Sequence, residues 1–455
     1  MPAALDKKYL WHPFTLTDAW LAADYAPTVI VSGDGSWLCD DQGNKYLDGN
    51  SSIWTNIHGH RNATVSGAIR AQLDRIAHSS FLGLTNELAP VLGKRLVELA
   101  DDDRLTRCFF SDDGATAIEA ALKITYQFFA QNGEPQRKKF VSLSAGYHGD
   151  TVGAMSVGHS KLFHHCYRNM LFESDEVPVP YCYRCPFNQA APQRADARAY
   201  ARCGRECIAA VEKKFAADGA RAAAWVVEPR VQGAAGFIMH PDNYLAETCA
   251  IAQRHGALVI LDEVMTGFGR TGAIFAWQKE QVAPDLVALA KALTGGYLPL
   301  AVTLLTEKIF DGFRGDATRT FFHGHSYTGN QLGCAAALAT LDILQSDNCA
   351  DRQRRLAAAL TAAHEKFWSL PAVGDVRQEG CILAIELVKD FSTREPFDPS
   401  LRVGARVCEA AKKHGLLTRP AGRDVLLLMP PYTTTPAEVD VMVSALCKGI
   451  EEVVN

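Results

Sequence analysis

The segment Val259–Gly272, with the sequence VILDEVMTGFGRTG, decides the fold. It continues an apolar run that starts at Ala257, and it then places two carboxylates, Asp262 and Glu263, before a glycine-rich turn. A short, continuous apolar run predicts a strand that is buried on both faces of a parallel sheet. Asp262 is therefore predicted to lie at the end of a buried strand, where an unpaired carboxylate is costly and calls for a cationic partner.

The glycines of this segment, Gly267–Gly272, spell GxGxxG, but they lack the context of a dinucleotide-binding loop. That fingerprint opens a helix and is followed by an acid about twenty residues later. Here the acids precede the glycines, and Ala273–Trp277 does not begin with residues that start a helix. We interpret the glycines as a tight loop beside the end of the strand.

Similar apolar runs alternate with helical patterns through the middle of the chain. The other runs lie at residues 107–110, 139–143, 223–227 and 286–290, and the strongest helical pattern covers 115–130. This alternation predicts an α/β fold, in which helices cover both faces of a mostly parallel sheet.

The two ends of the chain have a different pattern. Residues 28–49 predict a hairpin around Asp41–Gly43. The C-terminal part predicts helices at 351–367 and 401–413 and strands at 381–388 and 425–429. We expect a large α/β domain over 61–340 and a smaller α+β domain that combines 1–60 with 341–455.

Composition excludes several classes of protein. The 455 residues carry a net charge of −5, which does not fit the basic footprint of a nucleic-acid-binding protein. There is no uncharged apolar run of about eighteen residues, so we expect no membrane span. The N-terminal residues have no apolar signal core, and we expect a cytoplasmic protein.

The thirteen cysteines are scattered along the chain, as expected for free thiols in a reducing compartment. One cluster departs from this scatter, because Cys182, Cys185, Cys203 and Cys207 have a spacing that could hold zinc through four thiolates. The alternative is an inserted loop with incidental cysteines. Since spacing is the only support for zinc, we expect no metal site.

Three further segments offer partners for Asp262. Gly114 and Ala115 open a helix after a strand, where free N–H groups would bind a phosphate, although an ordinary capped helix needs no ligand. Tyr147 follows a strand and can cover a planar ligand, although a tyrosine in a turn is more often simple packing. Lys291 ends a buried run, where its pKa can fall, although such a lysine can also reach the surface.

Together these features match the needs of pyridoxal 5'-phosphate. This cofactor requires a phosphate seat, a ring against its face, a lysine for the Schiff base and a carboxylate at the pyridine nitrogen. We therefore predict that Asp262 faces the cationic ring nitrogen of this cofactor.

The chain resembles the class III aminotransferases of the type I pyridoxal-phosphate fold over almost its whole length. The motifs that carry the resemblance are SDDGATAIEAALK (111–123), GYHGDTVGAMSVG (146–158), VVEPRVQGAAG (226–236), LDEVMTGFGRTG (261–272), DLVALAKALTGGYLPLAV (285–302) and FFHGHSYTGNQLGCAAA (321–337). Within that class, WHPFT (11–15), SSIW (51–54), HGH (323–325), TRP (418–420) and MPP (429–431) resemble the branch that converts 8-amino-7-oxononanoate to 7,8-diaminononanoate in biotin biosynthesis.

The resemblance implies a role for each matching residue. Lys291 would form the Schiff base and move the proton, Asp262 would pair with the ring nitrogen, and Tyr147 would lie against the ring. Gly114 and Ala115 would bind the phosphate, with an alanine where the family often has a serine. The other implied residues are Glu228 and Gln232 beside the ring, Gly324, His325 and Ser326 from the second subunit of a homodimer, and Phe14, Ile53, Trp54 and Arg419 around the small-molecule substrates. Arg270 and Asp150 are further candidates.

Two departures from the branch concern the amino donor. Members that use S-adenosylmethionine commonly have WHPYT and SSWW, whereas this chain has Phe14 and Ile53. A hydroxyl and an aromatic wall for a large cationic donor are therefore missing. Relatives with similar FFHGHSYTGNQ and LLTRP runs use lysine, and we lean slightly to lysine as the donor.

Three alternatives stay open. The nearest is a broad ω-amino-acid or diamine transaminase of the same fold. An aminomutase would share the fold and the lysine but would need no donor. A non-catalytic cofactor- or zinc-binding module would not be expected to keep Lys291, Asp262 and Tyr147 together.

Overall fold

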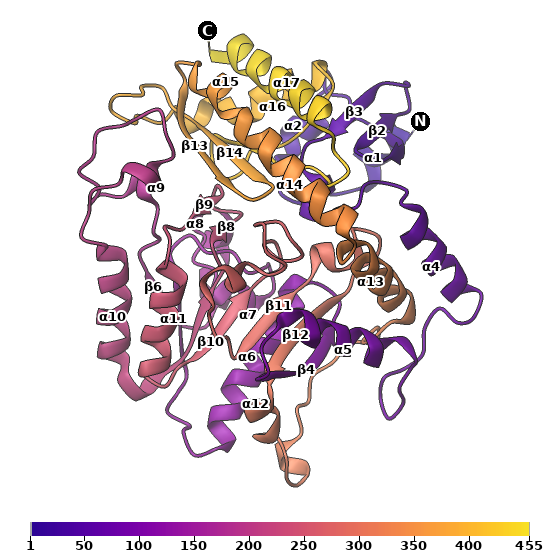
Figure 1. Ribbon diagram of the computed structural model, residues 1–455, viewed down its shortest axis with the longest axis vertical. Coiled ribbons are helices and arrows are strands. Elements are labelled where there is room, and N and C mark those ends of the chain that lie inside the picture. The colour runs from indigo at the N-terminus through magenta and orange to yellow at the C-terminus, as the bar shows by residue number, and fades with distance from the viewer. Residues whose placement is uncertain (1, 455) are drawn as a thin grey trace.

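A seven-stranded sheet forms the centre of the protein, for which a computed structural model describes residues 2–454 (Figure 1). The strand order is β4-β12-β11-β10-β7-β5-β6, and only β12 runs antiparallel to its neighbours. The strands are β4 (Leu105–Ser111), β12 (Ala301–Thr306), β11 (Leu286–Leu289), β10 (Leu258–Asp262), β7 (Ala222–Val227), β5 (Lys139–Leu143) and β6 (Asp175–Val177). The predicted α/β fold with a mostly parallel sheet is confirmed.

Helices cover both faces of this sheet because its strands are apolar on both sides. In β10, Leu258 and Ile260 pack in the same buried cluster as residues of α6 (Gly114–Gln131). Val259 and Leu261 pack on the other face. That face is covered by α5 (Leu88–Ala100), α10 (Glu206–Asp218), α11 (Tyr244–Arg254) and α13 (Gln331–Leu344). The alternation of side chains along a strand explains this division.

The two ends of the chain meet in a second region. The predicted hairpin is present as β2 (Trp37–Asp40) and β3 (Lys45–Asp48), and β15 (Leu416–Leu417) pairs with β3 in parallel. The remaining elements are β1 (Ile30–Asp34), β13 (Val373–Glu379), β14 (Ile382–Leu387), β16 (Val425–Leu428), α14 (Asp347–Ala362), α16 (Val403–Lys413) and α17 (Pro436–Val454). The three-part division of the chain stays a prediction, and its boundary at residue 340 falls inside α13.

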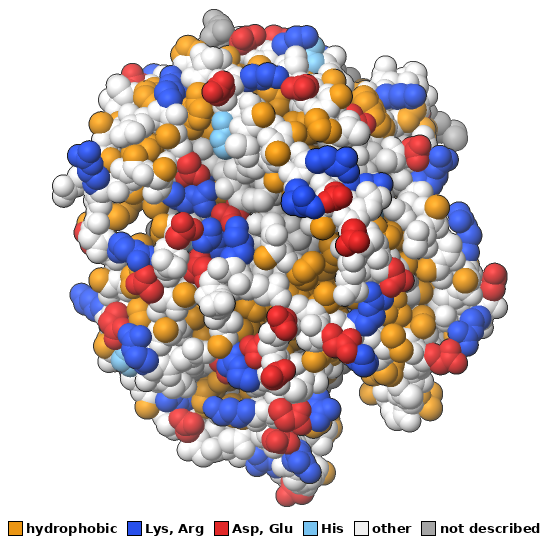
Figure 2. Space-filling view, in the orientation of Figure 1, with side chains coloured by type: hydrophobic (Ala, Val, Ile, Leu, Met, Phe, Trp, Pro, Cys, Tyr) orange, Lys and Arg blue, Asp and Glu red, His pale blue; other side chains and the backbone are white. Residues whose placement is uncertain are grey.

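The surface and the helices agree with the composition. Figure 2 shows acidic and basic side chains interspersed over the visible face, without a large patch of one sign. Among the residues that the structure describes, no helix is long and apolar enough to cross a membrane.

Candidate active site

A cavity of about 730 Å³ lies where the central parallel strands end. Asp262 ends β10, Lys291 follows β11, Glu228 follows β7, and Tyr147 follows β5. Because the carboxyl ends of parallel strands meet at one edge of a sheet, residues far apart in the sequence come together here. The candidates that line the cavity are Ile53, Trp54, Gly114, Ala115, Tyr147, Asp150, Glu228, Asp262 and Lys291.

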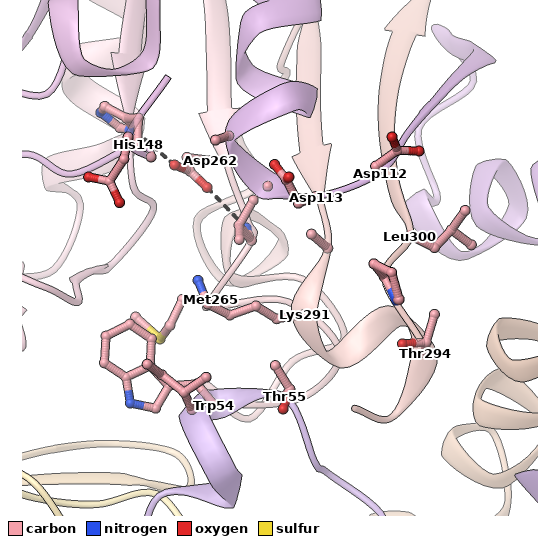
Figure 3. Close-up of a pocket in the computed structure, with 18 of the residues that line it drawn as sticks. Trp54, Thr55, Asp112, Asp113, His148, Asp262, Met265, Lys291, Thr294 and Leu300 are labelled. Atoms are coloured by element: carbon pink, nitrogen blue, oxygen red, sulfur yellow. Dashed lines mark hydrogen bonds and ion pairs between the residues drawn. The ribbon is translucent and has the colours of Figure 1, made fainter. Parts of the chain in front are cut away.

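Asp262 is buried and hydrogen-bonded on both carboxylate oxygens. Its Oδ2 lies 2.7 Å from His148 Nδ1, and its Oδ1 accepts a hydrogen bond from Val264 N at 3.1 Å (Figure 3). Burial favours the neutral ring of His148, but the hydrogen bond to Asp262 and the charges of Asp262 and Glu228 prevail, so the pKa of His148 is raised. His148 is therefore suited to be the cationic partner of Asp262.

Lys291 points its amino group into the cavity. The residue has a left-handed backbone (φ 45°) at the start of a short 3-10 helix, Lys291–Thr294. Its Nζ lies 5.2 Å from the centre of the Trp54 ring, and no ion pair holds it within residues 2–454. Burial lowers the pKa of Lys291, although the charges of Asp262 and Glu228 oppose the shift. A larger neutral fraction makes this amine a better nucleophile and base.

Glu228 is a second buried acid beside the cavity. Its Oε1 accepts a hydrogen bond from Tyr147 N at 3.3 Å, and its Oε2 accepts one from Gly233 N at 2.8 Å. Burial, with the charge of Asp262, raises the pKa of Glu228 to about 7, and the charge of His148 opposes the shift. This residue can change its charge near neutral pH.

Tyr147 stands in the cavity wall next to Asp150. Its hydroxyl donates to Asp150 Oδ2 at 2.7 Å, and its ring stacks on His164 at 5.9 Å between centroids. Burial, with the nearby charge of Asp150, raises the pKa of Tyr147. The ring is therefore neutral and held by contacts on its far side.

The start of α6 supplies two free backbone donors. Asp113 caps the helix through a 2.9 Å hydrogen bond from Thr116 N to its Oδ1. Within residues 2–454, the N–H groups of Gly114 and Ala115 donate to no protein atom. A side chain could not replace the hydrogen of Gly114, because a Cβ there would lie 2.6 Å from Val264 Cγ1. These features fit a phosphate seat.

Trp54, Ile53 and Phe14 are arranged at increasing distance from the cavity. Trp54 packs edge-on against Phe237 with ring centres 5.1 Å apart, and Ile53 beside it is 44% exposed. Phe14 does not line the cavity, but its ring lies 5.4 Å from Phe163, which in turn lies 5.8 Å from Tyr147.

Arg270, Gln232 and Arg419 are placed outside the cavity lining. Arg270 is buried, and its Nη1 donates to the carbonyl oxygens of Met429 and Pro430 at 3.4 and 2.8 Å. It therefore joins the glycine-rich loop to the C-terminal region. Gln232 is buried and its Nε2 donates to a backbone carbonyl at 3.3 Å, whereas Arg419 is exposed.

Gly324, His325 and Ser326 also lie outside the lining of the cavity. His325 Nδ1 is 3.7 Å from Asp112 Oδ2, and Asp112 does line the cavity. Ser326 is exposed, and its carbonyl oxygen lies 2.8 Å from His78 Nε2. Within one chain this segment touches only the rim of the site.

Two features of the site were not predicted from the sequence. His148 was quoted within its motif but not assigned a role, although its place between Tyr147 and a glycine could have drawn attention to it. Asp112 and Asp113 make the phosphate end of the cavity acidic. The four cysteines of the proposed zinc cluster are free. Within residues 2–454, no group of three or more His, Cys, Asp or Glu side chains is arranged to hold a metal ion, so the zinc alternative has no support.

Comparisons with known proteins agree with this geometry. Residues 21–450 match the family described as aminotransferase class-III. The adenosylmethionine-8-amino-7-oxononanoate aminotransferase of Geobacter sulfurreducens is 45% identical over 98% of this chain and 97% of its own length. The crystal structure of the enzyme of that name from Methanocaldococcus jannaschii is 38% identical, with a TM-score of 0.92 and 99% of both chains covered. An amine transaminase from an uncultivated Pseudomonas species, solved with pyridoxal phosphate bound, is 36% identical, with a TM-score of 0.90 over 98% of this chain and 99% of that one.

The residues of the cavity fit pyridoxal 5'-phosphate, which is the cofactor of this protein. Lys291 offers an amine without an ion pair, Asp262 offers a buried carboxylate, and the start of α6 offers free N–H groups beside a glycine that admits no side chain. The chain belongs to the class III aminotransferase family and is a pyridoxal-phosphate-dependent transaminase.

Proposed function

We propose that this protein transfers an amino group from S-adenosylmethionine to 8-amino-7-oxononanoate and so produces 7,8-diaminononanoate for biotin synthesis. The names of relatives that are 38–46% identical over nearly all of this chain support both substrates. The structural observation that carries the proposal is the Lys291 amine, which shares one cavity with the buried Asp262 carboxylate.

The charge of the cavity favours a cationic amino donor. Asp112, Asp113, Asp150, Glu228 and Asp262 line it, against Lys291 and His148 as basic groups. S-adenosylmethionine carries a sulfonium and an ammonium group, and lysine carries two ammonium groups, so either donor suits this lining. The relatives' names favour S-adenosylmethionine, whereas Phe14 and Ile53 are the reasons to keep lysine as the alternative.

We assign the chemical roles as follows. Bound pyridoxal phosphate supplies an electron sink for the substrate carbon that gains or loses the amino group. Lys291 Nζ takes a proton from that carbon and returns it, which its lowered pKa favours. Asp262 would hold the protonated ring nitrogen, and Tyr147 would cover the ring. The N–H groups of Gly114 and Ala115 would bind the phosphate.

The substrate-binding roles of the remaining candidates belong to the same proposal. Arg419 would receive the carboxylate of the oxononanoate through its planar fork. Trp54 and Ile53 would form the wall of the cavity, with Phe14 behind them and Gly324 at the rim. Glu228 and Gln232 would support the ring.

A homodimer would complete the phosphate site. In this arrangement, His325 and Ser326 of a second copy approach the start of α6. Exposed apolar side chains near this segment support it, since Leu82 is 90% and Phe322 is 80% exposed. The thirteen free thiols are compatible with a cytoplasmic location.

The test is product formation by the purified, cofactor-loaded protein. We expect 7,8-diaminononanoate, measured by mass spectrometry, when 8-amino-7-oxononanoate is supplied with S-adenosylmethionine. Lys291→Ala should reduce turnover by at least about a thousandfold while the circular dichroism stays native. Turnover of ω-amino acids or diamines without turnover of the oxononanoate would favour the broad transaminase instead.

A further inference from the structure

The segment Gly233–Phe237, here called the 233–237 turn, forms part of the cavity wall. The N–H groups of Gly236 and Phe237 both donate to Gly233 O, at 3.2 and 3.0 Å. Gly233 N donates to Glu228 Oε2 at 2.8 Å, and Ala234 lines the cavity. Phe237 has a left-handed backbone (φ 52°), which is unfavourable for a residue with a bulky side chain and needs support from its surroundings.

Arg377, in β13, supplies this support from the C-terminal region. Its Nε donates to Phe237 O at 2.7 Å, and its Nη2 donates to Gly236 O at 2.5 Å. The side chain is buried, and its charge is balanced by Asp375 Oδ2 and Glu386 Oε2, at 2.9 and 2.8 Å from Nη1. A planar fork can hold two successive carbonyl groups in one orientation, which a lysine cannot do.

The effect of this contact reaches the cavity through an aromatic pair. The Phe237 ring is fully buried and packs edge-on against Trp54. Trp54 lies beside Lys291 in the cavity (Figure 3). Its Nε1 is buried without a partner in the part of the chain that the structure describes, so packing alone orients the ring. A shift of the turn would therefore move the wall that faces the substrate.

We propose that Arg377 is a positioning residue for substrate binding, because it fixes the 233–237 turn and, through Phe237, the Trp54 wall. Arg377 touches no group that lines the cavity, so it acts on substrate affinity and not on proton transfer at Lys291. The inference rests on the proposed function only in that Trp54 must face a substrate.

The test compares Arg377→Lys with the matched control Arg198→Lys. Arg198 also binds β13, through Glu379 Oε2 at 3.0 Å and Gln378 O at 2.8 Å, but it does not contact the turn. We expect Arg377→Lys to raise KM on the order of tenfold, the effect of losing a charge-assisted hydrogen bond, with kcat within about twofold. Arg198→Lys should keep the native KM. The visible circular dichroism of the bound cofactor should stay native in both.

A second variant keeps the proposal testable if Arg377→Lys is poorly folded. Phe237→Leu breaks the contact with Trp54 directly and should also raise KM. If both act through the same wall, the double variant should raise KM by less than the product of the single effects. A native KM in Arg377→Lys, an equal rise in Arg198→Lys, or fully multiplicative effects would overturn the proposal.

The assay separates this inference from the proposed function. If the native protein does not turn over 8-amino-7-oxononanoate, the proposed function has failed. The KM comparison is then made with the donor and acceptor that the native protein does turn over.

Discussion

His148 Nδ1 lies 2.7 Å from Asp262 Oδ2, and both side chains are buried beneath the active-site cavity. An isolated buried carboxylate would tend to take up a proton, and a neutral Asp262 could not balance a protonated pyridine nitrogen. The raised pKa of His148 and its hydrogen bond to Asp262 keep the carboxylate charged and oriented.

Replacing His148 should therefore weaken cofactor binding. We expect His148→Phe to raise the dissociation constant of pyridoxal phosphate by about tenfold or more, the scale of one hydrogen bond to a charged group. His148→Gln, which keeps a donor, should lie between this variant and the native protein. The measurement is cofactor release during dialysis, followed by absorbance. Native affinity in His148→Phe would show that Asp262 does not need this partner.

Glu228 should give the donor affinity a pH dependence. Its pKa is raised to about 7 by burial, and so the residue is neutral below this pH and charged above it. The cavity gains a negative charge between pH 6 and 8, and kcat/KM for a cationic donor should rise about fivefold for this reason. Glu228→Gln should remove this part of the rise. If the Gln variant keeps the native pH profile, another group is responsible.

His240 should limit stability in acid. The residue is fully buried, and neither ring nitrogen has a hydrogen-bond partner within residues 2–454. Burial, with the charges of Arg230 and Arg198, lowers the pKa of His240 to about 3. A folded-state pKa below the unfolded value of about 6.5 means that stability is fully present above pH 6.5 and is lost as the pH falls toward 3.

His240→Phe removes this titration and can keep the edge-on packing against Tyr244. Between pH 7.5 and 4.5, the unfolding free energy of the variant should improve by about 2 to 3 kcal/mol relative to the native protein. Urea titrations at the two pH values measure this difference. His165→Phe, at the exposed surface, controls for the loss of a histidine. Parallel pH profiles for native and His240→Phe would refute the assignment.

Ile53 offers a test of donor selection. It is 44% exposed and lines the cavity where some S-adenosylmethionine-dependent relatives have a second tryptophan. Ile53→Trp should lower KM for S-adenosylmethionine by about two- to fivefold, because the ring can face the sulfonium cation. Phe14→Tyr, which restores only a hydroxyl outside the cavity lining, is the companion variant. An equal improvement for lysine would mean that this wall does not discriminate between donors.

The sequence contained enough to predict the sheet and the centre of the site. Continuous apolar runs identified β10 and β11, and the residues that follow parallel strands converge at one sheet edge, which is why Asp262 and Lys291 meet. The direction of β12 could not be predicted in this way, because an apolar run does not reveal whether a strand is parallel or antiparallel.

Contacts that depend on tertiary packing were also out of reach. Arg377 and Phe237 are 140 positions apart, and no local pattern joins them. The partner of Asp262 was unassigned because a histidine in a turn has many possible orientations. The positions of Arg419 and of the 324–326 segment outside the cavity lining of one chain likewise depend on how distant elements pack.

The most direct test of the central claim is the donor half-reaction, followed by absorbance. Cofactor-loaded protein is mixed separately with S-adenosylmethionine and with L-lysine, and the pyridoxal band is followed as it converts to the pyridoxamine form. We predict conversion with S-adenosylmethionine and return of the original band when 8-amino-7-oxononanoate is added. Conversion with lysine alone would change the donor but keep the acceptor. Conversion only with β-alanine or a diamine, and no return with the oxononanoate, would contradict the account.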